Sequence, residues 1–268
     1  MKYYRRFKQL ILLPVTLAFL FLSCASYQSV TFKSAQGTEN SLVLKGNLFK
    51  PEGNGRFPAV VVLHGCAGID YHFRAWAEQL VEWGYVALIA DSFRPRGVNR
   101  VCGKSYRVPG LERASDAYGA AIYLKQLPYV VSENIGLMGF SHGGWTGLRA
   151  VQKNFPYTVN LETNPFKAAV LFYPSCYYAH DQYISIPTLI LIGEKDDWTP
   201  ASRCVELDKW VTNPDMLELI VYEGAYHDFD RPKGNREYLG HTLKYDDVAT
   251  KDAKERTRKF FDRHLMVK

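Results

Sequence analysis

The feature that most constrains the fold of this chain is a series of short apolar runs with helix-length segments between them. Residues 58–63 are almost all apolar and rich in β-branched side chains, which is typical of a strand buried on both faces of a sheet. The pattern predicts strands over 30–33, 42–49, 58–63, 85–90, 135–140, 168–173, 187–192 and 217–222, and helices over 73–83, 111–127, 143–153, 201–210 and 248–265. This alternation predicts an α/β fold, with a mostly parallel, doubly wound sheet and helices on both faces. The first two strands alternate in polarity, so we expect them to be antiparallel.

Length and composition favour one domain of this kind. The chain has 268 residues, of which 47% are hydrophobic, so it can bury a sizeable core. Such a composition excludes a disordered chain, a collagen and a small disulfide scaffold. Because the sequence contains no internal repeat and no linker rich in Pro, Gly or Ser, we expect a single domain over residues 28–268.

The first 23 residues have the pattern of an export signal. Residues 1–8 carry four cations and no anion, an apolar run follows over 10–22, and small residues come next. The run is shorter than the roughly 20 residues of a membrane-spanning helix, so a spanning anchor is the weaker interpretation. Cleavage before Cys24 would give a lipoprotein with a lipidated cysteine, and residues 21–24 resemble a lipobox apart from Phe21; cleavage after Ala25 would give a plain secreted protein. We favour the lipoprotein, and expect a periplasmic chain or one anchored to the cell envelope through Cys24.

The positive charge of the chain belongs mostly to this signal. The formal net charge is +6, from 33 Lys and Arg against 27 Asp and Glu. Without residues 1–23 the excess falls to +2, because that segment holds four cations and no anion. No basic cluster with interleaved aromatic residues remains, so the sequence predicts no nucleic-acid partner.

Four cysteines follow Cys24, at positions 66, 102, 176 and 204. An even number in an exported chain favours disulfides, and four cysteines allow three pairings. We expect bridges 66–102 and 176–204, because each would join neighbouring loops at one end of the sheet; four buried free thiols are the alternative. The spacing resembles no zinc site, so no metal is expected.

Residues 139–143 read Gly-Phe-Ser-His-Gly, a G-x-S-x-G motif between the strand at 135–140 and the helix at 143–153. A sharp strand-to-helix turn lifts the serine hydroxyl clear of the sheet, and the helix N-terminus supplies free amides for an oxyanion. The motif therefore predicts that Ser141 is a nucleophile. A glycine-rich turn with an incidental serine is the alternative.

A serine hydroxyl needs a general base, and that base needs an orienting acid. Asp196 follows the strand at 187–192, and His227 follows the strand at 217–222, so both lie at strand ends in the order Ser, acid, His. Asp197 is the alternative acid. Either aspartate could instead be a solvated loop carboxylate or an N-cap for the helix at 201–210.

An oxyanion hole needs two donors. The amide of His142 is one, and the loop at 64–68, which follows the strand at 58–63, suggests the amide of Cys66 as the other. We expect His64 to position this loop, and the ring of His142 to act as a rim or packing group.

Three motifs resemble those of the α/β-hydrolase fold and, within it, the dienelactone hydrolase family: the elbow at 139–143, the loop Gly193-x-x-Asp196-x-x-x-Pro200, and residues 222–227. The resemblance covers most of the chain after the signal. Its glycine–acid–proline spacing favours Asp196 over Asp197, and the family's oxyanion amide maps onto Cys66.

Position 141 departs from the family, because dienelactone hydrolases proper use a cysteine nucleophile. The serine suits a general esterase. The resemblance also places an arginine that binds a substrate carboxylate four residues after the histidine, at Arg231. A surface salt bridge to Asp228 or Asp230 is the alternative role of Arg231.

Aromatic residues are expected to wall the cleft, in a manner suited to aromatic or sugar-linked esters. The candidates are Trp145, Tyr177, Tyr178, Trp198 and Tyr226, with ordinary loop packing as the alternative. The long segment after the strand at 85–90 carries Arg94, Arg96, Arg100 and Arg107, and is either a cap over the cleft or a solvated basic loop.

The sequence thus predicts an exported serine hydrolase that cleaves small-molecule carboxylic esters or lactones through an acyl-enzyme, without cofactor or metal. A peptidase or amidase with the same triad is one alternative. A non-catalytic envelope lipoprotein that binds a partner is the other.

Overall fold

The computed structural model describes residues 27–35, 41–155 and 161–266. The predicted signal over residues 1–23 and the lipidation site at Cys24 lie outside the described residues. In the described ranges, no helix combines the length and the apolar character that crossing a membrane requires.

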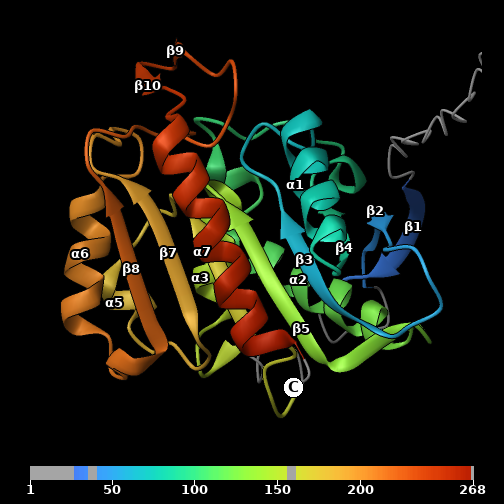
Figure 1. The fold of residues 1–268 in the computed structure, drawn as a ribbon. Helices are drawn as coiled ribbons and strands as arrows, with labels where there is room; N and C mark the ends of the chain where they lie inside the picture. Colours follow the sequence, from blue (N-terminus) through green and yellow to red (C-terminus); the bar gives the residue numbers. More distant parts are fainter. Residues whose placement is uncertain (1–26, 36–40, 156–160, 267–268) are drawn as a thin grey trace, which may run out of the picture.

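An eight-stranded sheet forms the centre of the structure (Figure 1), with the strand order β1-β2-β4-β3-β5-β6-β7-β8. The strands are β1 Gln28–Lys33, β2 Val43–Phe49, β3 Phe57–Leu63, β4 Val86–Asp91, β5 Val130–Phe140, β6 Ala168–Phe172, β7 Thr188–Gly193 and β8 Leu217–Tyr222. β1 pairs antiparallel with β2, and β2 pairs antiparallel with β4. All pairs from β4 to β8 are parallel, which confirms the predicted fold class.

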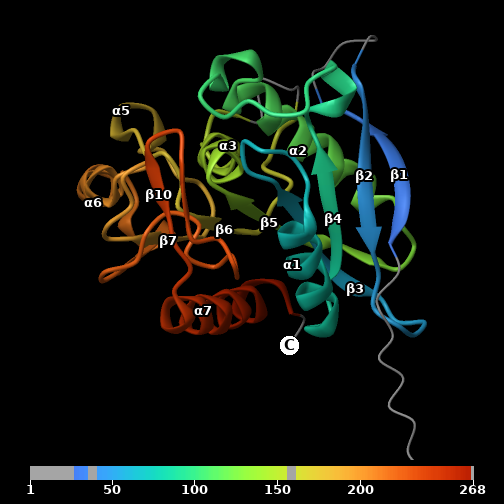
Figure 2. The ribbon, with the colours of Figure 1, turned by 90° about the horizontal axis from the view of Figure 1, so that it is seen from above.

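Helices cover both faces of the sheet (Figure 2). α1 Tyr71–Glu82 and α7 Asp247–Leu265 lie on one face, and α2 Gly110–Lys125, α3 His142–Ala150, the short α5 Tyr178–Asp181 and α6 Ala201–Trp210 lie on the other. Three-residue 3-10 turns occupy 94–96, 105–107 and 214–216. Asp70 caps α1 by accepting a hydrogen bond from the His72 amide, and Asp246 caps α7 in the same way through the Ala249 amide.

The core lies between the sheet and these helices. All six residues of β4 are buried, and so are all but the first residue of β3, as expected for strands covered on both faces. A second, much smaller apolar cluster lies under the loop after β4 and consists of Phe93, Val98, Val101 and Val108. Cys66 packs against this small cluster, which lies beside the site described below.

Some elements were not predicted. β5 begins at Val130, before the predicted start, and a short hairpin of β9 Arg236–Tyr238 and β10 His241–Leu243 stands above the carboxyl ends of the strands (Figure 1). Three-residue strands are too short to show a periodic pattern, so the hairpin has no clear signature in the sequence.

Both expected disulfides are present in the structure. Cys66 bonds to Cys102, and Cys176 bonds to Cys204. The first joins the loop after β3 to the loop after β4, and the second joins the loop after β6 to α6.

Candidate active site

Ser141 lies in the turn between β5 and α3 with a backbone φ of 51°. This left-handed conformation costs a non-glycine residue of order 1–3 kcal/mol and is typical of functional turns. The flanking glycines make the turn feasible: a Cβ on Gly139 would lie 2.3 Å from the Gly143 carbonyl oxygen, and a Cβ on Gly143 would lie 2.2 Å from that of Leu63. The turn is fixed further because the Ser141 amide donates to the Phe172 carbonyl at 2.9 Å.

The structure brings the three predicted triad residues together. Nε2 of His227 lies 3.0 Å from Oγ of Ser141, and Nδ1 of His227 lies 2.7 Å from Oδ2 of Asp196. His227 and Asp196 are 3% and 4% exposed, so the contacts are largely shielded from water. With the Nδ1 proton donated to the carboxylate, Nε2 is free to accept the Ser141 proton.

Asp196 is held by its own loop. Oδ1 accepts hydrogen bonds from the amides of Trp198 and Thr199 at 3.0 and 2.7 Å. Oδ2 lies 2.9 Å from the Thr199 hydroxyl, which itself lies 3.2 Å from Nδ1 of His227. The Thr199 hydroxyl therefore contacts both Asp196 and His227 and restricts their orientation. We did not predict this role, although the residue lies within the acid loop.

Asp197 lies outside this group. Its carboxylate is 44% exposed and accepts from the Thr242 amide through both oxygens, at 3.0 and 3.1 Å. It therefore anchors β10 beside the site. The N-cap of α6 is Pro200, with no side-chain capping bond, so the suggestion that an aspartate caps this helix is wrong.

Two opposing effects act on the pKa of His227. Burial alone would lower it, but the Asp196 carboxylate, with smaller contributions from Asp228 and Asp230, raises the pKa above its ordinary value. The imidazolium that forms when the ring accepts a proton is thereby stabilised.

Cys66 and His142 line the cavity beside Ser141, and a Cβ on Gly65, the residue before Cys66, would lie 3.8 Å from the Cβ of Ser141. His142 is the first residue of α3, so its N–H has no partner within the helix. Among the described residues, no protein acceptor takes a hydrogen bond from the amide of Cys66 or of His142. Both donors are therefore available to a negatively charged oxygen on Ser141.

A buried arginine supports this side of the site, and we did not predict it. Arg113 on α2 is fully buried; its Nη1 donates to Nδ1 of His142 at 2.7 Å, and its Nη2 donates to the His64 carbonyl at 2.8 Å. Burial lowers the pKa of Arg113 to about 9. Burial, together with Arg113, lowers the pKa of His142 to about 3, so its ring is a neutral acceptor. An arginine within an alanine-rich helix gave no sequence signal of this contact.

His64 matches the expected positioning role. Its ring is buried, and Nδ1 donates to the Gly65 carbonyl oxygen at 2.8 Å. Burial, with Arg113 as the next contribution, holds the pKa of His64 well below its ordinary value. The ring is therefore neutral and fixes the backbone that leads to Cys66.

Two cavities meet at Ser141. The larger, of about 310 Å³, is lined by Trp145 and Tyr177, and the smaller, of about 60 Å³, contains Arg231. Trp198 lines both. All four predicted substrate contacts therefore border the site. Tyr178 and Tyr226 line neither cavity.

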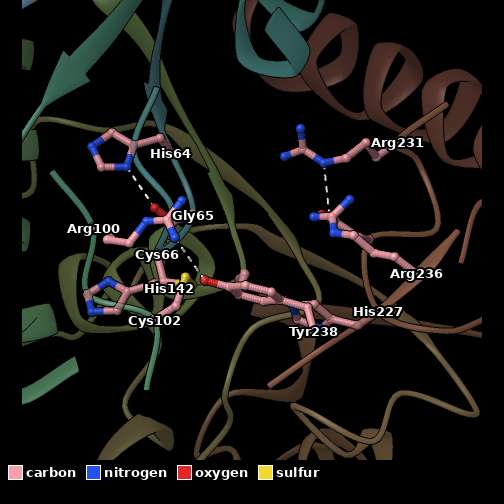
Figure 3. The surroundings of a disulfide bond; sticks show 12 residues. His64, Gly65, Cys66, Arg100, Cys102, His142, His227, Arg231, Arg236 and Tyr238 are labelled. Carbon is pink, nitrogen blue, oxygen red and sulfur yellow. Dashed lines mark hydrogen bonds and ion pairs between the residues drawn. A yellow bond between two sulfur atoms is a disulfide. The ribbon is translucent and has the colours of Figure 1, made fainter. Parts of the chain in front are cut away.

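Arg231 is already engaged by two carboxylates. Nε bonds to Asp228 at 2.8 Å, Nη1 bonds to Asp70 at 2.7 Å, and the residue is only 7% exposed. Burial opposes its charge, but Asp228 and Asp70 raise the pKa of Arg231 above its ordinary value. Figure 3 shows Arg236 beside Arg231. Arg236 borders the same cavity, and its side chain is 48% exposed against 9% for Arg231, so it is the more accessible cation.

In the described part of the chain, no three His, Cys, Asp or Glu side chains are grouped in a way that could hold a metal ion.

Comparison with known proteins gives concordant matches. The model of the dienelactone hydrolase family matches residues 44–265. A protein of Bradyrhizobium sp. named "Probable 2-oxo-3-(5-oxofuran-2-ylidene)propanoate lactonase" is 25% identical over 201 residues, which cover 68% of this chain and 77% of that protein. A protein of Synechocystis sp. named "Putative carboxymethylenebutenolidase" is 28% identical over 116 residues, which cover 39% of this chain and 47% of that protein. The matched part thus spans about half the length of the Synechocystis relative.

A solved structure shares the fold. The crystal structure described as "Putative Dienelactone Hydrolase" from Klebsiella pneumoniae subsp. pneumoniae MGH 78578 superposes with a TM-score of 0.69 at 18% identity. The superposition covers 89% of this chain and 99% of the Klebsiella chain.

Proposed function

The chain belongs to the dienelactone hydrolase family of ester and lactone hydrolases, and on that premise we propose that it is an exported serine hydrolase with the triad Ser141, His227 and Asp196. One observation carries the proposal: contacts of 3.0 and 2.7 Å link the Ser141 hydroxyl through His227 to a buried carboxylate. The three residues follow β5, β8 and β7, and this geometry supports the roles proposed for them.

In the proposed reaction, Oγ of Ser141 attacks the carbonyl carbon and passes its proton to Nε2 of His227. The amides of Cys66 and His142 bind the oxygen of the tetrahedral intermediate, which carries a full negative charge. His227 then gives its proton to the leaving alcohol, and the acyl-enzyme forms. Water attacks the acyl-enzyme with His227 as base, which releases the acid and restores the serine.

We propose that the two cavities divide the substrate between them. The larger takes an apolar or aromatic group against Trp145 and Tyr177, and the smaller takes a compact group near Arg231. Trp198 contacts both parts because it borders both cavities. The proposed substrates are small-molecule carboxylic esters or lactones.

Export is also part of the proposal. It is supported by the signal pattern in residues 1–23 and by two disulfides, which persist mainly in oxidising compartments. Attachment to the membrane through a lipidated Cys24 is proposed on the lipobox-like residues 21–24 alone. Metabolic labelling with a fatty acid tests it: the wild type should take up label and Cys24→Ala should not.

The reaction is tested with short p-nitrophenyl esters, a lactone panel and a fluorophosphonate probe. The wild type should turn over esters and be labelled, and Ser141→Ala should lose both properties. A wild type that neither reacts with the probe nor hydrolyses any ester would favour a non-catalytic envelope protein. Faster hydrolysis of peptides than of esters would favour a peptidase.

A further inference from the structure

Two bonds connect Cys66 to residues 101–102, one a disulfide and the other a hydrogen bond. Its Sγ is bonded to Cys102, and its carbonyl oxygen accepts a hydrogen bond from the Val101 amide at 2.8 Å. Figure 3 shows the disulfide with its surrounding side chains, and Arg100 of the same segment points toward the Tyr238 hydroxyl. The position of the Cys66 amide therefore depends on the position of residues 101–102.

The packing of that segment is confined to one side. Val101 is buried in the small cluster with Phe93, Val98 and Val108, whereas residues 103–107 are exposed. On the far side, Arg100 donates to the Tyr238 hydroxyl at 3.5 Å, which is a long contact. The disulfide is thus the strongest bond between the segment and the loop at 64–68.

We propose that Cys102 is a positioning residue for the reaction: through its disulfide it holds the Cys66 amide where it binds the oxyanion. This inference rests on the proposed function, because it assigns a task within that reaction. Cys102 itself stays outside the reacting atoms, although it borders both cavities. Displacement of a donor by about 1 Å can cost on the order of 10²-fold in rate, so loss of the covalent link alone is enough to lower the rate.

The second disulfide supplies a matched control. Cys176–Cys204 spans 28 residues and Cys66–Cys102 spans 36, so their loss should remove similar chain constraints from the unfolded state. Cys176 and Cys204 are 1% and 0% exposed, and neither lines a cavity at Ser141. The two disulfides should therefore contribute similarly to stability, but only Cys66–Cys102 lies beside Ser141.

The test compares Cys102→Ser with the double variant Cys176→Ser/Cys204→Ser on a p-nitrophenyl ester. We expect kcat to fall about 10- to 100-fold in Cys102→Ser with KM changed less than threefold, because ground-state contacts remain. The control should lose a similar amount of Tm and keep kcat within about threefold. Equal kcat in both variants and the wild type would overturn the inference while leaving the proposed function intact.

The affinity for a transition-state analogue distinguishes a displaced Cys66 amide from a general loss of structure in the variant. A trifluoromethyl ketone forms a tetrahedral adduct on Ser141 whose oxygen occupies the oxyanion position. Its affinity should fall in Cys102→Ser by the same factor as kcat/KM, while the affinity for the product alcohol stays unchanged. If the ketone binds Cys102→Ser as tightly as the wild type, the disulfide does not position the donor.

Reduction of the folded control variant tests the Cys66–Cys102 bond without any substitution at Cys66 or Cys102. In the Cys176→Ser/Cys204→Ser background only one disulfide remains among the four cysteines after Cys24, and dithiothreitol should lower kcat to the level of Cys102→Ser. Reoxidation should restore the activity. Full activity with both thiols alkylatable would overturn the inference, and an inactive wild type would instead overturn the proposed function.

Discussion

The two sides of Ser141 are built in different ways. On the side of His227, the working groups are side chains joined by hydrogen bonds of 2.7 to 3.0 Å and buried from water. On the side of Cys66, the working groups are backbone amides, and what fixes them are the disulfide to Cys102 and the buried guanidinium of Arg113.

This difference determines at which positions the proposed reaction needs a particular side chain. In the proposed reaction, the His227 side requires a particular imidazole and carboxylate, because proton transfer depends on their chemistry. The Cys66 side requires only N–H groups in the right place, which any residue type other than proline provides. Substitutions on the first side should therefore remove a chemical group, and those on the second should displace one.

Between the two sides of Ser141, the largest expected effect comes from the Asp196 carboxylate. Asp196→Asn should lower kcat by about 10⁴-fold, because an amide cannot stabilise the imidazolium and favours the wrong tautomer of His227. Asp197→Asn should lower kcat less than tenfold, since the Asp197 side chain contacts Thr242 and His241 of the hairpin and neither His227 nor Ser141. Steady-state kinetics on one ester measures both.

These two variants form their own control, because they are adjacent and isosteric changes. A larger loss in Asp197→Asn than in Asp196→Asn would show that the acid has been assigned to the wrong residue.

The pH profile is expected to separate the two sides further. His227 must be neutral to accept the Ser141 proton, and the pKa of His227 is raised by Asp196. The acid limb of kcat/KM should therefore have its midpoint above the ordinary histidine value of about 6.5, with activity falling roughly tenfold per unit below it. Because the pKa of His142 is lowered to about 3, its ring should add no second limb.

Variants sharpen this profile. Cys102→Ser should lower the height of the curve and leave the midpoint in place, whereas Asp196→Asn should move the midpoint to lower pH by removing the neighbouring charge. A wild-type midpoint well below the ordinary histidine value would contradict the arrangement of charges around His227.

The same contrast explains what could be read from the sequence. Ser141, Asp196 and His227 each follow an apolar strand, and the carboxyl ends of parallel strands meet at one edge, so their convergence was predictable. Cys66 was predictable for the same reason, since it follows β3.

Apart from the expected disulfide between Cys66 and Cys102, the side-chain contacts around the site were not predictable. Arg113 lies on the first turn of α2, where its burial depends on the tertiary packing of that helix against α3. Tyr238 belongs to a three-residue strand without periodicity. The ion pair between Arg231 and Asp70 joins residues 161 positions apart, whereas the expected partner Asp228 is three residues away. Single-sequence patterns describe strands and turns well and long-range side-chain contacts poorly.

The smallest expected effect concerns charge selection at the smaller cavity. Because Asp228 and Asp70 occupy the guanidinium of Arg231, Arg231→Gln should change kcat/KM for anionic and neutral esters by the same factor. Arg236 is 48% exposed, and exposed ion pairs contribute at most about 1 kcal/mol. Arg236→Gln should therefore raise KM for an anionic ester by no more than about fivefold and leave a neutral ester unaffected. A selective loss of anionic substrates in Arg231→Gln would instead mean that a substrate carboxylate displaces Asp228 or Asp70, as the family resemblance implies.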